Sequence, residues 1–128
     1  MLDTNIISDM VKHPRGQAAL RARTCADQLC TSIIVAAELR YGSTKKKAPE
    51  LIYKVNQILN EISVLALDVK ADAFYGLIRC DLEAAGQPIG SNDLLIAAHA
   101  LSLNLTLVTA NVREFSRVSG LKVENWLE

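Results

Sequence analysis

Residues 28–42, QLCTSIIVAAELRYG, show how this chain is built. The first four, 28–31, form a short β-like run, and Ser32 can then cap a strongly apolar helix over 33–39. Gly42 is expected to end that helix, because glycine readily adopts the left-handed conformation that follows many helices. The stretch therefore predicts a short buried strand that leads directly into a helix.

The same alternation of short apolar runs and helical patterns continues along the rest of the chain. Helices are predicted at 6–11, 16–23, 51–62, 71–82 and 94–103. Further strands are predicted at 1–2, 64–67, 105–108 and, as an edge strand, 123–127. Such alternation is typical of a parallel sheet covered on both faces. We therefore predict one domain over residues 1–128, a three-layer α/β/α fold with a short, mostly parallel sheet of about four or five strands.

The composition limits the possible functions. Half of the 128 residues are hydrophobic, and 14 basic residues balance 14 acidic ones, so the chain should fold and carries no net charge. Contact with a polyanion would therefore need a local basic patch or bound cations. Three cysteines without a Cys-x-x-Cys pair are expected to be reduced thiols. No leader and no membrane-spanning run is recognised, so we expect a soluble, cytoplasmic protein.

Three acidic side chains stand where carboxylates are unexpected. Asp3 directly follows the first strand, Glu38 interrupts the apolar helix, and Asp93 opens a long helix after a tight Pro-Ile-Gly loop. In an open parallel sheet, reactive groups gather beyond the carboxyl ends of the strands. A buried carboxylate without a partner is costly, and a bound cation would relieve that cost. Oxygen donors without histidine or cysteine suit Mg²⁺ or Mn²⁺ rather than zinc.

Each acid also has a purely structural explanation. Asp3 could cap the helix that follows it, unless a neighbouring polar residue does so. Glu38 could pair with a distant cation or lie on a narrow polar face. Asp93 could stabilise the positive end of its helix, although Ser91 or Asn92 is expected to supply the cap. Taken one by one, the acids leave both explanations open.

Four sequence blocks taken together resemble one known family, the VapC-type toxins of the PIN-domain ribonucleases. The similarity extends over essentially the whole chain. The blocks are Leu2-Asp3-Thr4-Asn5, Ala37-Glu38-Leu39-x-Tyr41-Gly42, Pro88-Ile89-Gly90-x-Asn92-Asp93-Leu94-Leu95-Ile96-Ala97-Ala98-His99-Ala100 and Leu107-Val108-Thr109-x-Asn111-x-Arg113-Glu114-Phe115. Gly120-Leu121 and Glu124-Asn125-Trp126 also look like that family.

The resemblance implies the toxin component of a type II toxin–antitoxin system. It implies a Mg²⁺- or Mn²⁺-dependent endoribonuclease that cleaves RNA with a metal-activated water and is inhibited by a cognate VapB-type antitoxin. By motif position, Asp3, Glu38 and Asp93 correspond to the three core metal-binding acids. Glu114 is the best match for a fourth catalytic acid, and the uncharged Asn111 lies beside it.

Further polar and basic residues are candidates for supporting roles. Those expected to orient carboxylates or to contact a phosphate, unless they serve only as caps and turns, are Thr4, Asn5, Ser91, Asn92 and Asn111. Those that could contact RNA, unless they only form a solvated basic loop, are Arg40, Lys45, Lys46, Lys47 and Arg113. His99 lies roughly 240° around its helix from Asp93, so we expect a structural role for it.

Two other functions fit the same residues. One is a PIN-type nuclease that acts on structured DNA, and the other is a non-catalytic binding module in which the acids are structural. The aliphatic residues of helices 16–23 and 51–62 suit a homodimer seam or a groove for an antitoxin segment. The resemblance implies a homodimer, an RNA substrate and an antitoxin partner, and the sequence does not identify the RNA.

Overall fold

The computed structural model describes residues 1–128 and contains a small, wholly parallel sheet. Its strands are β1 (Cys30–Ser32), β2 (Ser63–Leu65), β3 (Leu107–Val108) and β4 (Val123–Glu124). Leu2 lies between β1 and β3 and bridges to both in parallel. The order across the sheet is therefore β4, β3, Leu2, β1, β2, because β1 pairs with β2 and β3 with β4. The predicted parallel sheet of four or five strands is confirmed.

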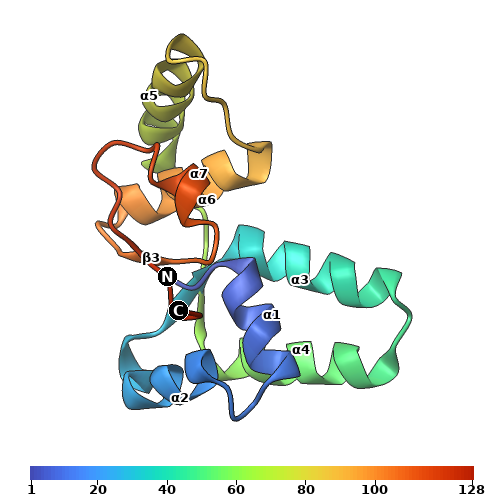
Figure 1. The fold of residues 1–128 in the computed structure, drawn as a ribbon. Coiled ribbons are helices and arrows are strands. Elements are labelled where there is room, and N and C mark those ends of the chain that lie inside the picture. Colours follow the sequence, from blue (N-terminus) through green and yellow to red (C-terminus); the bar gives the residue numbers. More distant parts are fainter.

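Helices cover both faces of this sheet, as the sequence predicts. They are α1 (Thr4–Lys12), α2 (Gln17–Thr24), α3 (Ile33–Lys45), α4 (Pro49–Glu61), α5 (Ala71–Ala84), α6 (Ser91–Ser102) and α7 (Val112–Phe115), with a 3₁₀ turn over Ala26–Gln28. Figure 1 shows α5, α6 and α7 on one side of the sheet and α1, α2 and α4 on the other. Helix α3 contacts α1, α4 and α6 and so links the two sides. None of the helices has the length and apolar character needed to cross a bilayer.

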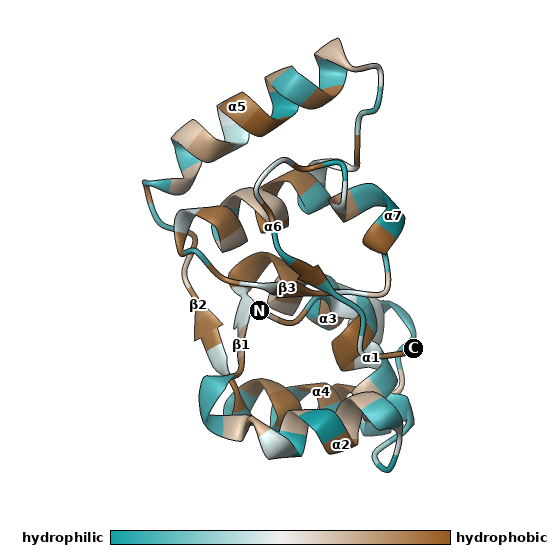
Figure 2. Cartoon of the chain, turned by 60° about the vertical axis from the view of Figure 1, so that its left-hand side comes forward, coloured by the Kyte–Doolittle hydropathy of each residue, from teal (hydrophilic) through white to brown (hydrophobic).

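Helix α6 lies at the centre of the core, and Asp93 is in its first turn. Ile96, Ala97, Ala98 and Ala100 are fully buried. The small alanine side chains let α5 pack closely on α6, and α6 also contacts β1, since His99 Nδ1 lies 2.8 Å from Ser32 Oγ. Figure 2 colours β3 and much of α6 as hydrophobic, in keeping with their burial. The first turn of α6 is therefore carried by a helix with little freedom to move.

Two predicted helix boundaries are wrong. Gly42 does not end its helix, because α3 continues to Lys45 while it packs along α4, and this packing outweighs the weak helix propensity of glycine. Lys45 therefore belongs to the helix and not to a basic loop. Ser91 and Asn92 are not caps, because α6 already begins at Ser91 and no side chain caps its first turn.

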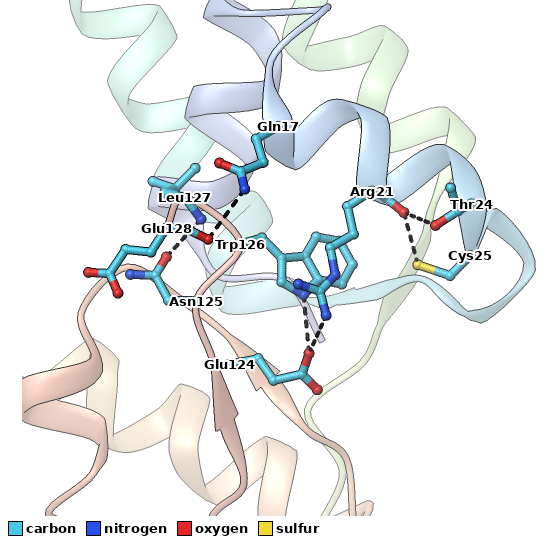
Figure 3. A network of polar contacts seen from close by, with 9 residues as sticks. All are labelled: Gln17, Arg21, Thr24, Cys25, Glu124, Asn125, Trp126, Leu127 and Glu128. Atoms are coloured by element: carbon cyan, nitrogen blue, oxygen red, sulfur yellow. Dashed lines mark hydrogen bonds and ion pairs between the residues drawn. The ribbon is translucent and has the colours of Figure 1, made fainter.

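The chain after β4 is fixed to α2 through Trp126. The indole is buried, its Nε1 donates to Glu124 Oε1 at 3.3 Å, and the Arg21 guanidinium lies 5.1 Å from the ring centroid. Figure 3 shows these three side chains together, with Arg21 also 3.2 Å from Glu124 Oε1. The predicted strand 123–127 is wrong beyond Glu124, because the Asn125 side chain accepts from Leu127 N and turns the chain. The chain end thus joins the sheet to the helical layer.

Substitution of Trp126 by alanine is expected to lower the free energy of unfolding by about 3–5 kcal/mol, because a large buried ring is removed. Urea denaturation followed by circular dichroism measures the change. The matched control is Arg21→Gln, which removes only the exposed cation and should cost less than about 1 kcal/mol. Equal losses in both variants would show that the ion pair, and not ring burial, fixes this segment.

Candidate active site

Four acids from different parts of the chain meet at one edge of the sheet. Asp3 follows the central Leu2, Glu38 comes from α3, Asp93 from α6 and Glu114 from α7. Their proximity is evident in the pKa of Asp93, which is raised to about 6 by burial and then by the charges of Asp3, Glu114 and Glu38. The structure therefore brings together all four acids that the sequence singles out.

Asp3 caps a helix and faces the other acids at the same time. Its Oδ1 accepts from Thr4 N at 2.8 Å, which is the cap of α1. Its Oδ2 accepts from Thr109 Oγ1 at 2.7 Å and from Asn5 Nδ2 at 3.3 Å. Burial nevertheless raises the pKa of Asp3, and the nearby Glu38 charge adds to that rise. The two explanations that the sequence leaves open for Asp3 are therefore compatible.

Glu38 is held by neutral donors and has no cationic partner. Thr4 Oγ1 donates to Glu38 Oε1 at 2.6 Å, and Asn92 Nδ2 donates to Oε2 at 3.4 Å. The three ion pairs of the structure all lie elsewhere. Arg40, two residues further on, donates to Asn56 Oδ1 on α4. The distant salt bridge considered for Glu38 does not form.

Asp93 and Glu114 face each other. After burial and the Asp3 charge, the charge of Glu114 raises the pKa of Asp93, because a nearby negative charge favours the protonated carboxyl. Asn111 Nδ2 donates to Glu114 Oε2 at 3.1 Å. Glu114 is thus the fourth acid of the cluster, and Asn111 orients it.

Sequence reasoning missed Thr109, which connects the parts of this site. Its side chain is fully buried. The hydroxyl donates to Asp3 and accepts from Asn111 N at 3.0 Å and from Asn5 Nδ2 at 3.3 Å. A polar residue directly after the predicted strand 105–108, at the carboxyl edge of the sheet, was the signal available in the sequence.

Several candidate residues lie outside the acid cluster. Ser91 is exposed and lines a separate cavity with Arg79 and Pro88. Lys45 Nζ lies 5.7 Å above the Tyr41 ring, and the remaining basic candidates lie on the surface. These are Arg40, Lys46, Lys47 and Arg113.

His99 has the structural role expected from its place on the helix. It is buried, and its Nδ1 lies 2.8 Å from Ser32 Oγ. Burial lowers the pKa of the imidazole, which favours the neutral ring inside the core.

The hydrogen bonds set the present orientation of the acids. In these orientations, no three acidic, histidine or cysteine side chains form a set that could hold a metal ion. The cluster supplies carboxylate oxygens of the kind that Mg²⁺ and Mn²⁺ prefer, and it supplies no histidine or thiolate. The donor set therefore fits such an ion in chemistry, and its side chains would have to turn toward it.

The chain has a parallel sheet between two helical layers, with acids at the carboxyl edge of the sheet. In agreement with this architecture, the PIN-domain family matches residues 1–121. Ribonuclease VapC2 of Haemophilus influenzae (strain ATCC 51907 / DSM 11121 / KW20 / Rd) is 41% identical over 99% of this chain and 97% of its own length. The tRNA(fMet)-specific endonuclease VapC of Shigella flexneri is 38% identical over 98% of this chain and 96% of its own length.

Solved structures agree with these relatives. VapBC2 from Rickettsia felis, bound to a DNA fragment from the promoter, contains a chain with a TM-score of 0.92 and 38% identity, covering 98% of this chain and 97% of that one. DNA-bound VapBC from Salmonella typhimurium contains a chain with a TM-score of 0.93 and 37% identity. The match covers 98% of this chain and 96% of that one. The chain belongs to the VapC group of the PIN-domain family.

Proposed function

We propose that this protein is the toxin of a VapBC-type toxin–antitoxin system, a Mg²⁺- or Mn²⁺-dependent endoribonuclease inhibited by a VapB-type antitoxin. The observation that carries the proposal is the cluster of Asp3, Glu38, Asp93 and Glu114, whose charges repel one another with no cationic side chain in an ion pair among them. Its relatives named ribonuclease or endonuclease VapC support the same activity.

Asp3, Glu38 and Asp93 would hold the ion, with Glu114 beside them. When bound, a divalent ion stabilises charge on the phosphate and lowers the pKa of water. Asn5, Thr109 and the backbone of Thr4 keep the Asp3 carboxylate facing the cluster through their hydrogen bonds. Glu38 is held in the cluster by two neutral donors, Thr4 Oγ1 at 2.6 Å and Asn92 Nδ2 at 3.4 Å.

The chain itself offers a group that can take up a proton. Glu114, which lies beside the three proposed ligands and is not one of them, can accept the proton that an attacking water loses. Hydrolysis by water would leave 5′-phosphate and 3′-hydroxyl ends on the RNA. No residue of the cluster needs to form a covalent bond with the substrate.

Cleavage assays with matched RNA and single-stranded DNA test this proposal. The first RNA to use is a tRNA(fMet) transcript, because one relative is named for that substrate. We expect RNA cleavage with Mg²⁺ or Mn²⁺, none with a chelator, and 5′-phosphate ends. Cleavage of structured DNA in place of RNA would favour the other nuclease function, and neither cleavage nor Mn²⁺ binding would favour the binding module.

Mn²⁺ affinity is expected to fall about tenfold per pH unit below about pH 6, because a proton on Asp93 competes with the cation. The pKa of Asp93 is raised, so the proton is bound below about pH 6 and lost above it. Isothermal titration calorimetry between pH 5 and 8 measures the affinity, and buffers of different ionisation enthalpy report the released proton. Affinity that stays constant across this range would contradict the assigned ligand.

We propose that the antitoxin segment occupies a cavity between α1, α2 and α4. It has a volume of about 370 Å³, and Met10, Ala22, Ile58 and Ile62 are among its apolar lining residues. The helices predicted to carry such a groove supply most of this lining. The VapBC complexes among the similar structures show that relatives assemble with an antitoxin. The homodimer stays a prediction that analytical ultracentrifugation can test.

Substitution of Ile58 by lysine is expected to weaken antitoxin binding about tenfold or more, because a charge would enter the apolar cavity. The antitoxin for this test is to be sought as a VapB-type protein in the reading frame next to that of this chain, and surface plasmon resonance measures its affinity. RNA cleavage by the free variant should not change. Ile52→Lys is the matched control, because Ile52 is similarly half-buried on α4 but does not line the cavity. Equal weakening by both would contradict the assignment.

A further inference from the structure

A small cavity adjoins the acid cluster on the side of α1, α3 and α4. Its volume is about 100 Å³, and Thr4 and Glu38 line both the cavity and the acid cluster. Its other polar lining comes from Ser8 and Lys12 of α1, from Ser43 of α3 and from Lys46 just after α3, and the remaining lining is apolar. The cavity therefore lies directly beside the acid cluster, and Glu38 belongs to both.

Two free ammonium groups border this cavity. Lys12 and Lys46 are exposed, and neither takes part in any of the three ion pairs of the structure. A lysine near the end of a helix is common, because it interacts favourably with the last carbonyl groups. That explains each lysine alone. It does not explain why two lysines from different helices line one cavity next to Glu38.

Of the hydroxyl groups around the cavity, only that of Ser8 is a free donor. The Ser43 hydroxyl donates to the Arg40 carbonyl oxygen at 3.2 Å, and the Thr4 hydroxyl donates to Glu38. Ser8 is half-buried on α1, one helical turn before Lys12. The two ammonium groups and the Ser8 hydroxyl form a set of donors that suits a phosphate group, whose oxygens only accept. A metal-binding cavity would need the opposite set.

We propose that Lys12 and Lys46 bind a backbone phosphate of the RNA, one neighbouring the phosphate at the acid cluster. This inference rests on the proposed ribonuclease function and adds a binding subsite to it. Of the three lysines in the run 45–47, only Lys46 lines the cavity. The chain without net charge thus gains the local basic patch that contact with a polyanion needs.

RNA binding without metal tests the subsite. Fluorescence anisotropy in the presence of a chelator measures the affinity for a labelled 12-nucleotide single-stranded RNA and for a tRNA(fMet) transcript. The Lys12→Gln/Lys46→Gln double variant is expected to bind about tenfold or more weakly. The slope of log affinity against log salt for the single strand should fall by about 0.7, the change for one phosphate contact. Thermal melting confirms that each variant is folded.

The matched control is Lys45→Gln/Lys47→Gln, which removes the same charge from the same end of α3 but no residue of the cavity. We expect less than a twofold change in affinity. Equal losses in both double variants would overturn the proposal and indicate a diffuse basic surface. If the Lys12→Gln/Lys46→Gln variant loses affinity for the antitoxin and keeps its affinity for RNA, the proposal is also overturned. The cavity would then bind the protein partner and not a phosphate.

The two proposals fail in different ways. A wild-type chain that binds RNA through Lys12 and Lys46 but cleaves no RNA with Mg²⁺ or Mn²⁺ would refute the nuclease function alone. If the protein cleaves RNA but the Lys12→Gln and Lys46→Gln substitutions leave its RNA affinity unchanged, the phosphate subsite alone is refuted.

Discussion

Substitution of Asp93 by asparagine is expected to lower RNA cleavage by about 10³-fold or more and to stabilise the metal-free protein. The amide is nearly the same size but cannot carry the negative charge that a divalent ion needs, so transition-state stabilisation is lost. Stability should rise because burial and three neighbouring carboxylates oppose ionisation of Asp93. Activity and stability should therefore change in opposite directions.

The sign of the stability change follows from the pKa. The pKa of Asp93 is raised from 3.8 to about 6, so the folded state binds the proton more tightly than the unfolded state. The favourable contribution is fully present below about pH 3.8 and is lost as the pH rises through about 6. At neutral pH the ionised side chain is a cost, about 1 kcal/mol once solvent screening at this half-buried position is included.

Calorimetric melting at pH 7.5 with a chelator measures this effect, and we expect the midpoint to rise by about 4 °C. Asp72→Asn is the control, because Asp72 is exposed on α5 and its loss should change stability by less than about 0.5 kcal/mol. Below about pH 4 the advantage of Asp93→Asn should disappear. A folded Asp93→Asn or Asp93→Ala variant that cleaves RNA at the normal rate would refute the assignment of the site.

Substitution of Thr109 by valine is expected to lower Mn²⁺ affinity about 10- to 100-fold and to lower RNA cleavage with it. Valine keeps the shape of the side chain but removes the hydroxyl that donates to Asp3 at 2.7 Å. The same change leaves Asn111 N without its acceptor. Losing a group that orients a metal ligand has effects of this size in other metal sites.

Thr109→Ser separates hydrogen bonding from packing. Serine restores the hydroxyl and removes only a methyl group, so metal affinity should stay within a few-fold of the wild type, while stability falls by about 1 kcal/mol. Calorimetric titration with Mn²⁺ and denaturant unfolding give the two quantities separately. If valine binds Mn²⁺ normally and serine does not, the methyl group and not the hydroxyl positions Asp3.

The sequence predicts most of the fold because hydrophobic runs are local signals. The sequence correctly predicts the alternation of strand and helix around β1 and α3, because the pattern that indicates each element lies within a few residues. The errors lie at element ends. Packing against α4 carries α3 past Gly42, and this contact between separate elements is invisible in a local pattern.

Of the site residues, too, only those with a local signal could be predicted from the sequence. Glu38 can be singled out from its own helix, because an acid in an apolar stretch needs an explanation. Glu114 was found only through family resemblance, since nothing in its neighbourhood marks it. Thr109 and Lys12 were missed because their roles depend on partners far away in the chain, Asp3 for the first and Lys46 for the second.

The central position of Leu2 in the sheet has a consequence for how the protein is made. Residue 2 is synthesised long before Val108, one of the two residues that it bridges. Non-local pairing of this kind slows folding, because the entropy of closing a long loop must be overcome before the contact forms. Asp3 likewise cannot accept its hydrogen bond from Thr109 until residue 109 has been translated. A nascent chain on the ribosome therefore has no complete acid cluster until Glu114 has been translated, and the ability proposed here to cut RNA can arise only after that point.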